Sequence, residues 1–111
     1  MIPDHFFVPE PLRITSATTS DGMVRVRVGG EIDMATIAPL SEVLTVLIAT
    51  RPRAIEVDLA DVRFMDSSGV KALVRAHRSA SAGGCRVRVT RPQSTVDRVL
   101  RICGLAETLG L

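Results

Sequence analysis

The chain has 111 residues and 46% hydrophobic content, which is enough for one domain with one core but not for two. Aromatic residues make up only 3%, and no run approaches the ~20 apolar residues needed to span a bilayer, so we expect a cytoplasmic protein that does not bind membranes. The net charge of +2 is unevenly divided, because residues 1–66 hold ten acidic and six basic residues, whereas residues 67–111 hold two acidic and eight basic ones.

Strands and helices are predicted to alternate after a short leader. We expect residues 1–11 to form a mobile leader and residues 12–111 to form the single domain. Period-two alternation marks the strands, spacings of three and four mark the helices, and Ser20-Asp21-Gly22 favours a hairpin between the first two strands. The predicted elements are strands at 12–19 and 23–30, a helix at 36–49, a strand at 54–60, a helix after Asp66 that Gly83 ends, a strand at 85–90, and a helix with Pro92 in its first turn that Gly104 ends.

This order predicts an α/β fold, a mixed four-stranded sheet with about three helices packed on one face. Each strand-helix-strand crossover should be parallel and right-handed, and three helices are too few to cover both faces. Sites in such open sheets gather at the carboxyl ends of the strands. Three segments should meet there: GGEIDMAT after the second strand, DVRFMDSSG after the third and TRPQS after the fourth.

The basic residues of the strands suggest a nucleic-acid surface, but their placement favours a structural role. Charged residues alternate with apolar ones in three strands: Arg25 and Arg27, then Glu56 and Asp58, then Arg86 and Arg88. If the acidic strand lies between the basic ones, opposite charges pair across the open face, and each exposed pair contributes up to about 1 kcal/mol. Since stacking aromatics are also missing, we expect no direct binding to nucleic acid.

The two cysteines, Cys85 and Cys103, have neither metal-ligand spacing nor the density of a disulfide-stapled secreted domain. We expect two buried, reduced thiols. Both should nevertheless lie on the apolar side of the sheet, so a disulfide between them stays an open alternative. The sequence has no glycine pattern of the kinds that cradle nucleotides, and it predicts no cofactor and no metal.

The segment DSSG, residues 66–69, joins the third strand to the second helix and admits three interpretations. One is a helix cap, worth about 0.5–2 kcal/mol, which needs only one of these residues. Another is a hydrolase nucleophile, but His77 lies roughly 13 Å along the same helix from Ser68 and His5 lies in the leader, so we expect no enzyme. The third is a phosphorylated serine, whose phosphate would meet the helix dipole and its free N–H groups and would repel a partner by its charge.

Three segments resemble the STAS domain family, most closely its bacterial anti-sigma factor antagonists: GEIDMATIAPL, VDLADVRFMDSSGVKALV and RICGL. The resemblance covers nearly all of residues 12–111, and the strand followed by FMDSSG is its most specific part. It implies that the first serine of DSSG, Ser67, accepts phosphate from an anti-sigma factor that is itself a kinase. It also implies that Asp33 helps to engage that kinase or to shape the site. The implied partner-binding residues are Asp33, Asp66, Ser67, Ser68 and Gly69.

The same resemblance implies a partner-switching cycle. The unphosphorylated antagonist binds the anti-sigma factor, a serine kinase of the GHKL type, and so frees a sigma factor; phosphorylation ends this binding and a phosphatase restores it. We expect the chain to do this as a monomer. The alternative is a STAS module that serves without phosphorylation as a structural or transport-complex subunit, which the intact DSS segment disfavours.

Overall fold

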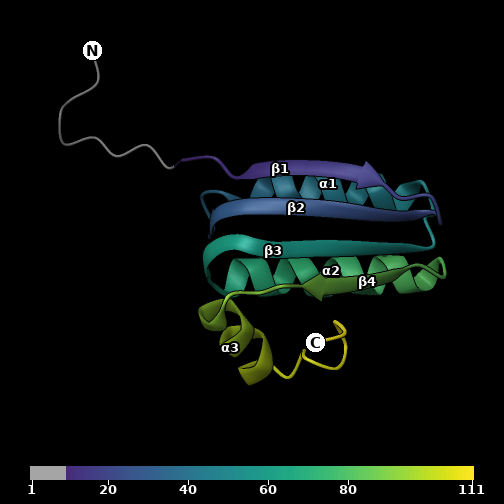
Figure 1. Ribbon diagram of the computed structural model, residues 1–111. Coiled ribbons are helices and arrows are strands. Elements are labelled where there is room, and N and C mark those ends of the chain that lie inside the picture. Colours follow the sequence, from purple (N-terminus) through teal and green to yellow (C-terminus); the bar gives the residue numbers. More distant parts are fainter. Residues whose placement is uncertain (1–9) are drawn as a thin grey trace, which may run out of the picture.

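The computed structural model describes residues 10–111, so the predicted leader lies, up to residue 9, outside the described residues. The elements are β1 (Arg13–Thr18), β2 (Met23–Ile32), α1 (Ile37–Ala49), β3 (Ala54–Met65), α2 (Ser67–Ala82), β4 (Arg86–Thr90) and α3 (Ser94–Ile102). The strands form one sheet in the order β1-β2-β3-β4, in which β1 is antiparallel to β2 and the other neighbours are parallel. Figure 1 shows α1 and α2 behind the sheet and α3 after the end of β4. The predicted mixed four-stranded sheet with three helices is therefore confirmed.

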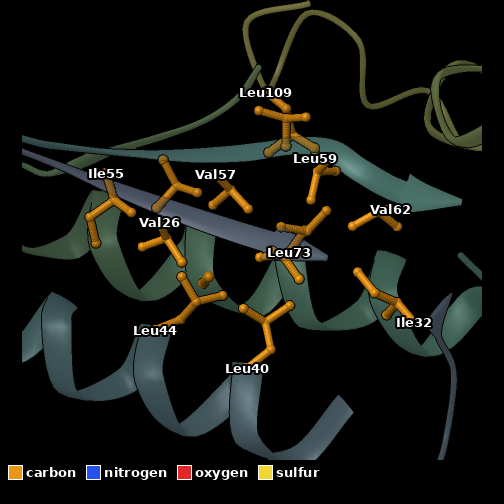
Figure 2. Close-up of a cluster of buried hydrophobic side chains, with 14 of the residues drawn as sticks. Val26, Ile32, Leu40, Leu44, Ile55, Val57, Leu59, Val62, Leu73 and Leu109 are labelled. Carbon is orange, nitrogen blue, oxygen red and sulfur yellow. The ribbon is translucent and has the colours of Figure 1, made fainter. Parts of the chain in front are cut away.

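The core lies between the sheet and the two helices behind it. In Figure 2, Leu40 and Leu44 of α1 and Leu73 of α2 point toward the sheet, and each is at most 2% exposed. The strand residues that complete this cluster share the apolar phase of their strands: Val24, Val26, Val28, Ile55, Val57, Leu59, Val87 and Val89. The core is therefore aliphatic, as the composition predicts, and period-two burial leaves the other face of the sheet to charged residues.

β2 and β3 both run further than the sequence predicts. β3 ends at Met65, five residues after the predicted end, and β2 ends at Ile32, two residues after it. The added residues of β2 and β3 pair with each other in the sheet. The register shifts after Arg27 and again after Gly30, which breaks the alternation of apolar and polar residues. Much of GGEIDMAT and DVRFMDSSG is therefore strand and not loop, because these irregularities mask the period-two pattern from which a strand is predicted.

α3 begins at Ser94, so the prediction that Pro92 lies in its first turn is wrong. The residue before the helix, Gln93, donates a hydrogen bond from Nε2 to the carbonyl oxygen of Ala60 in β3 at 2.8 Å. β4 is much shorter than β3, and α3 contacts β3 beyond the point where β4 stops. The position of the helix start thus depends on a contact with a strand that is distant in the sequence. The preference of proline for a first helical turn does not predict such a contact.

The acidic strand lies between the two basic strands, as predicted, and its carboxylates pair with β2. Arg25 Nε lies 3.0 Å from Glu56 Oε1, and Arg27 Nε lies 3.9 Å from Asp58 Oδ2. The prediction that the arginines of β4 also pair with carboxylates of β3 is wrong, because neither Arg86 nor Arg88 forms an ion pair within residues 10–111. The ladder of charges is therefore complete on one side of β3 only.

Asp58 is bound most closely by Arg91, a residue of the loop after β4. Arg91 Nη2 lies 2.5 Å from Asp58 Oδ2, and the Ala60 N–H donates to Asp58 Oδ1 at 3.0 Å. The Asp58 side chain is only 5% exposed, so this pair is not the exposed kind that the sequence predicts. Burial alone would raise the pKa of Asp58, but the hydrogen bonds from Arg91 and Ala60 and the charges of Arg91 and Arg27 lower it below its usual value. The carboxylate is thereby kept ionised beneath its arginines.

Both cysteines are free thiols. Cys85, just before β4, is 4% exposed, and burial raises the pKa of its thiol. Cys103 is exposed, so the prediction of two buried thiols is wrong for this residue. The reason is local, because α3 ends at Ile102 and the chain turns at Gly104. Cys103 therefore lies past the end of the helix, where the helical spacing that predicts its burial no longer applies.

Candidate functional site

The start of α2 is capped by the aspartate of the DSSG segment. Asp66 Oδ1 accepts the Ser68 N–H at 2.8 Å. The Asp66 carbonyl oxygen accepts the N–H groups of Gly69 at 3.1 Å and Val70 at 3.4 Å. Asp66 is therefore the helix cap among the three interpretations, and the N–H groups of Ser68, Gly69 and Val70 are not free for a phosphate. Ser67 is not needed for the cap.

The next side chains of α2 differ in exposure because the helix starts against the sheet. Ser67 is exposed, Ser68 is half-buried and Gly69 is buried. A Cβ at Gly69 would lie 2.5 Å from Met65 Cγ and 2.9 Å from Ile32 Cγ2, distances that leave no room for any side chain. Gly69 thus allows α2 to approach the ends of β2 and β3, and the same approach leaves Ser67 on the solvent side.

Asp33 follows β2 and organises the turn that leads into α1. Its Oδ1 accepts the N–H groups of Ala35 at 2.9 Å and Thr36 at 3.1 Å. Its own N–H donates to Thr36 Oγ1 at 3.0 Å, and that hydroxyl donates to the Glu31 carbonyl oxygen at 2.7 Å. Asp33 therefore holds the turn together, which is the structural role that a residue before a helix often has.

Asp33 and Asp66 leave neighbouring strands at the same level of the sheet. Ile32 lies opposite Met65 in the parallel pair, and the Asp66 N–H donates to the Ile32 carbonyl oxygen at 3.1 Å. The Asp33 turn and the DSSG segment therefore adjoin at the carboxyl edge of β2 and β3, where the sequence places them. The third segment expected there, TRPQS, follows the carboxyl end of β4 but meets β3 earlier, where Gln93 is bonded to Ala60, because β4 is short.

Two exposed apolar side chains lie at this edge, and the sequence analysis does not single out either. Met34, directly after Asp33, is 84% exposed, and Phe64, at the end of β3, is 48% exposed. Phe64 lies opposite Glu31 in the extended part of the sheet. Large exposed apolar side chains rimmed by polar groups mark interaction surfaces. Met34 could have been predicted from its position directly after Asp33. Phe64 could not, because it lies in the segment predicted to be a loop.

The chemistry available at this edge is that of an exposed hydroxyl beside carboxylates. His77 lies nine residues beyond Ser68 on α2, and its Nδ1 is buried with no hydrogen-bond partner in the described part of the chain. Within residues 10–111, no cluster of three or more His, Cys, Asp and Glu side chains could hold a metal ion. The helices in that range include none with the length and apolar character to cross a membrane. Ser67 is thus suited to accept a group that a partner supplies.

Comparisons with known sequences give a family match and relatives that cover most of the chain. A family model described as "STAS domain" matches residues 15–111. An anti-sigma-B factor antagonist of Staphylococcus aureus is 32% identical over 92 residues, which are 83% of this chain and 85% of the relative. The anti-sigma-F factor antagonist RsfB of Mycobacterium tuberculosis is 30% identical over 103 residues, which are 93% of this chain and 83% of the relative.

Solved structures are similar over most of the chain as well. An anti-sigma factor antagonist from Mycobacterium paratuberculosis has a TM-score of 0.70 at 31% identity, and the match covers 87% of this chain and 83% of that one. The unphosphorylated form of SpoIIAA, an anti-sigma factor antagonist, has a TM-score of 0.72 at 23% identity, covering 86% and 84% of the two chains. The second likeness supports the fold alone.

Proposed function

This chain belongs to the STAS domain family, and on that premise we propose that it is an anti-sigma factor antagonist switched by phosphorylation of Ser67. In the unphosphorylated form it binds an anti-sigma factor that is a serine kinase of the GHKL type, and it thereby frees a sigma factor. Phosphate on Ser67 ends this binding, and a phosphatase restores it. The proposed partner-binding residues are Asp33, Asp66, Ser67, Ser68 and Gly69.

The exposed hydroxyl of Ser67 is the observation that carries this proposal. Asp66 already caps α2, so Ser67 has no structural task at the helix start. Its side chain is exposed and a kinase can reach it without local unfolding. Met34 and Phe64 offer apolar contact area on the same edge, so a partner docked there would cover Ser67. A phosphate adds a charge of about −1.5 to −2, which this interface would have to bury beside Asp66.

The partner in this proposal is a protein and not a nucleic acid. Arg25 and Arg27 on the open face are already paired with carboxylates of β3, although Arg86 and Arg88 of β4 form no ion pair within residues 10–111. The exposed Phe64 lies at one end of that face, and a lone aromatic side chain does not form a stacking platform for successive bases. We therefore propose that the chain acts on transcription through protein contacts, as a monomer.

Incubation with the anti-sigma factor kinase and ATP should place one phosphate on Ser67. The neighbouring Ser68 is half-buried and its N–H is held by Asp66, so its hydroxyl is less accessible. The kinase is the one that co-purifies with this chain from its native cell, and the site is mapped by mass spectrometry. Modification confined to Ser68 would contradict the assignment. Tight binding without any phosphorylation would favour the alternative, a STAS module that serves as a structural or transport-complex subunit.

Asp33→Asn should weaken binding to the kinase while leaving the fold nearly unchanged. Asn keeps an Oδ1 acceptor for the N–H groups of Ala35 and Thr36 but removes the charge. Asp33→Ala removes both the acceptor and the charge, so it should also lower the free energy of unfolding by about 1 kcal/mol. Urea unfolding and calorimetric titration of both variants separate the two roles. Unchanged affinity for both, with lower stability for Asp33→Ala only, would leave Asp33 with the turn-forming role alone.

A further inference from the structure

We propose that Lys71 is the cation that binds the phosphate of phosphorylated Ser67, so that the chain itself neutralises part of the charge it gains. The inference rests on the proposed phosphorylation of Ser67 and concerns the regulation of that same site. It makes Lys71 a positioning residue, which holds the phosphate over the first turn of α2 and contributes to the stability of the modified domain.

Three N–H groups at the start of α2 are already bonded to Asp66. A phosphate at a helix start is commonly held by free N–H groups. Here the Ser68 N–H donates to Asp66 Oδ1, and the N–H groups of Gly69 and Val70 donate to the Asp66 carbonyl oxygen. A phosphate on Ser67 that used these groups would have to displace the cap. A side-chain cation can compensate its charge and leave the cap intact.

Lys71 is the residue of α2 that can supply this cation. It lies four positions after Ser67, and residues at this spacing are neighbours on one face of a helix. Both side chains are exposed, and an acidic group that precedes a lysine by four positions is in the favourable orientation. Lys71 forms no ion pair within residues 10–111.

The other charges near the start of α2 do not take this role. From Ser67 to Ala82 the helix contains no acidic residue, so nothing on α2 competes with the phosphate for Lys71. The next cation on the helix, Arg75, lies eight positions after Ser67, about 12 Å along the axis at the usual rise. Outside the helix, the carboxylates of Asp66 and of Asp33 on the adjoining turn repel a phosphate. The phosphate is thus drawn toward Lys71 and away from the Asp33 turn.

Thermal unfolding of phosphorylated and unphosphorylated protein tests this pairing. Phosphoserine is inserted at position 67 during translation, so no kinase is needed, and Tm is measured for the wild type, Lys71→Gln, Lys71→Arg and Arg75→Gln. We expect the phosphate to raise Tm of the wild type by about 2–4 °C. The rise should be smaller in Lys71→Gln, where only the favourable effect of a negative charge at the helix start remains, and it should be retained in Lys71→Arg and in Arg75→Gln, which removes the same charge from a more distant position. Sodium chloride at 1 M should diminish the rise in the wild type.

The change in Tm caused by the phosphate, and not Tm itself, decides the outcome. A merely structural role of Lys71 would shift both forms of Lys71→Gln alike. An equal change in Tm for wild type and Lys71→Gln would overturn the proposed pairing. The switch proposal fails separately, if the kinase leaves Ser67 unmodified or the partner binds the phosphorylated protein as tightly as the unphosphorylated one.

Discussion

Ser67→Asp should weaken binding to the anti-sigma factor by at least about tenfold, because a buried like-charge contact costs more than the ~1.4 kcal/mol that a factor of ten requires. Ser67→Ala should bind as tightly as the wild type and resist inactivation by the kinase. The loss in Ser67→Asp should arise at the interface alone. A negative charge at a helix start is favourable by about 0.3–1 kcal/mol, so this variant should melt no lower than the wild type.

Calorimetric titration against the anti-sigma factor, with nucleotide present, measures both affinities. Ser81→Asp is the matched control, since Ser81 is exposed and lies near the end of α2, about 21 Å along the helix from Ser67 at the usual rise. It should leave the affinity unchanged. Equal affinity of the wild type and a completely phosphorylated sample would end the switch hypothesis, and the unphosphorylated-module alternative would take its place.

Gly69→Ala should lower the free energy of unfolding by about 1–2 kcal/mol. The added methyl group would meet Met65 Cγ at 2.5 Å and Ile32 Cγ2 at 2.9 Å, and overpacking of this kind typically costs about 1–3 kcal/mol. The better helix propensity of alanine offsets up to about 1 kcal/mol of that cost. If the helix start shifts to relieve the contact, Ser67 moves with it, and partner binding should weaken as well.

Gly83→Ala is the control for this change, because the nearest atom to its added Cβ is Ala80 O at 3.7 Å. Its free energy of unfolding should stay within about 0.5 kcal/mol of the wild type. Urea unfolding of both variants gives the comparison. Gly69→Ala as stable as Gly83→Ala would show that the packing at the start of α2 yields easily, and that Gly69 does not hold Ser67 in place.

Local patterns in the sequence were sufficient to predict the type and order of the strands and helices. The period of the apolar residues identified every strand and helix, and it separated the buried face of the sheet from the charged one. The crossover rule predicted the parallel pairing, whereas the place of the acidic strand between the basic ones was a condition that the structure meets. The DSSG and GEID segments pointed to the edge where Asp33 and Asp66 adjoin. These features were predictable because each depends on residues close together in the chain or on a general rule of topology.

Contacts between distant residues decided the remaining features. The extension of β2 and β3 depends on their mutual register, whose irregularities remove the strand period that a sequence displays. The bond between Arg91 and Asp58 arises because β4 ends early and its loop folds back over β3. Gly69 has no room for a Cβ beside Met65 and Ile32 because α2 is seated against the ends of two strands. Residue type and spacing report which side of an element is buried, whereas the partner of a polar group and the room around a glycine are set by how the elements pack.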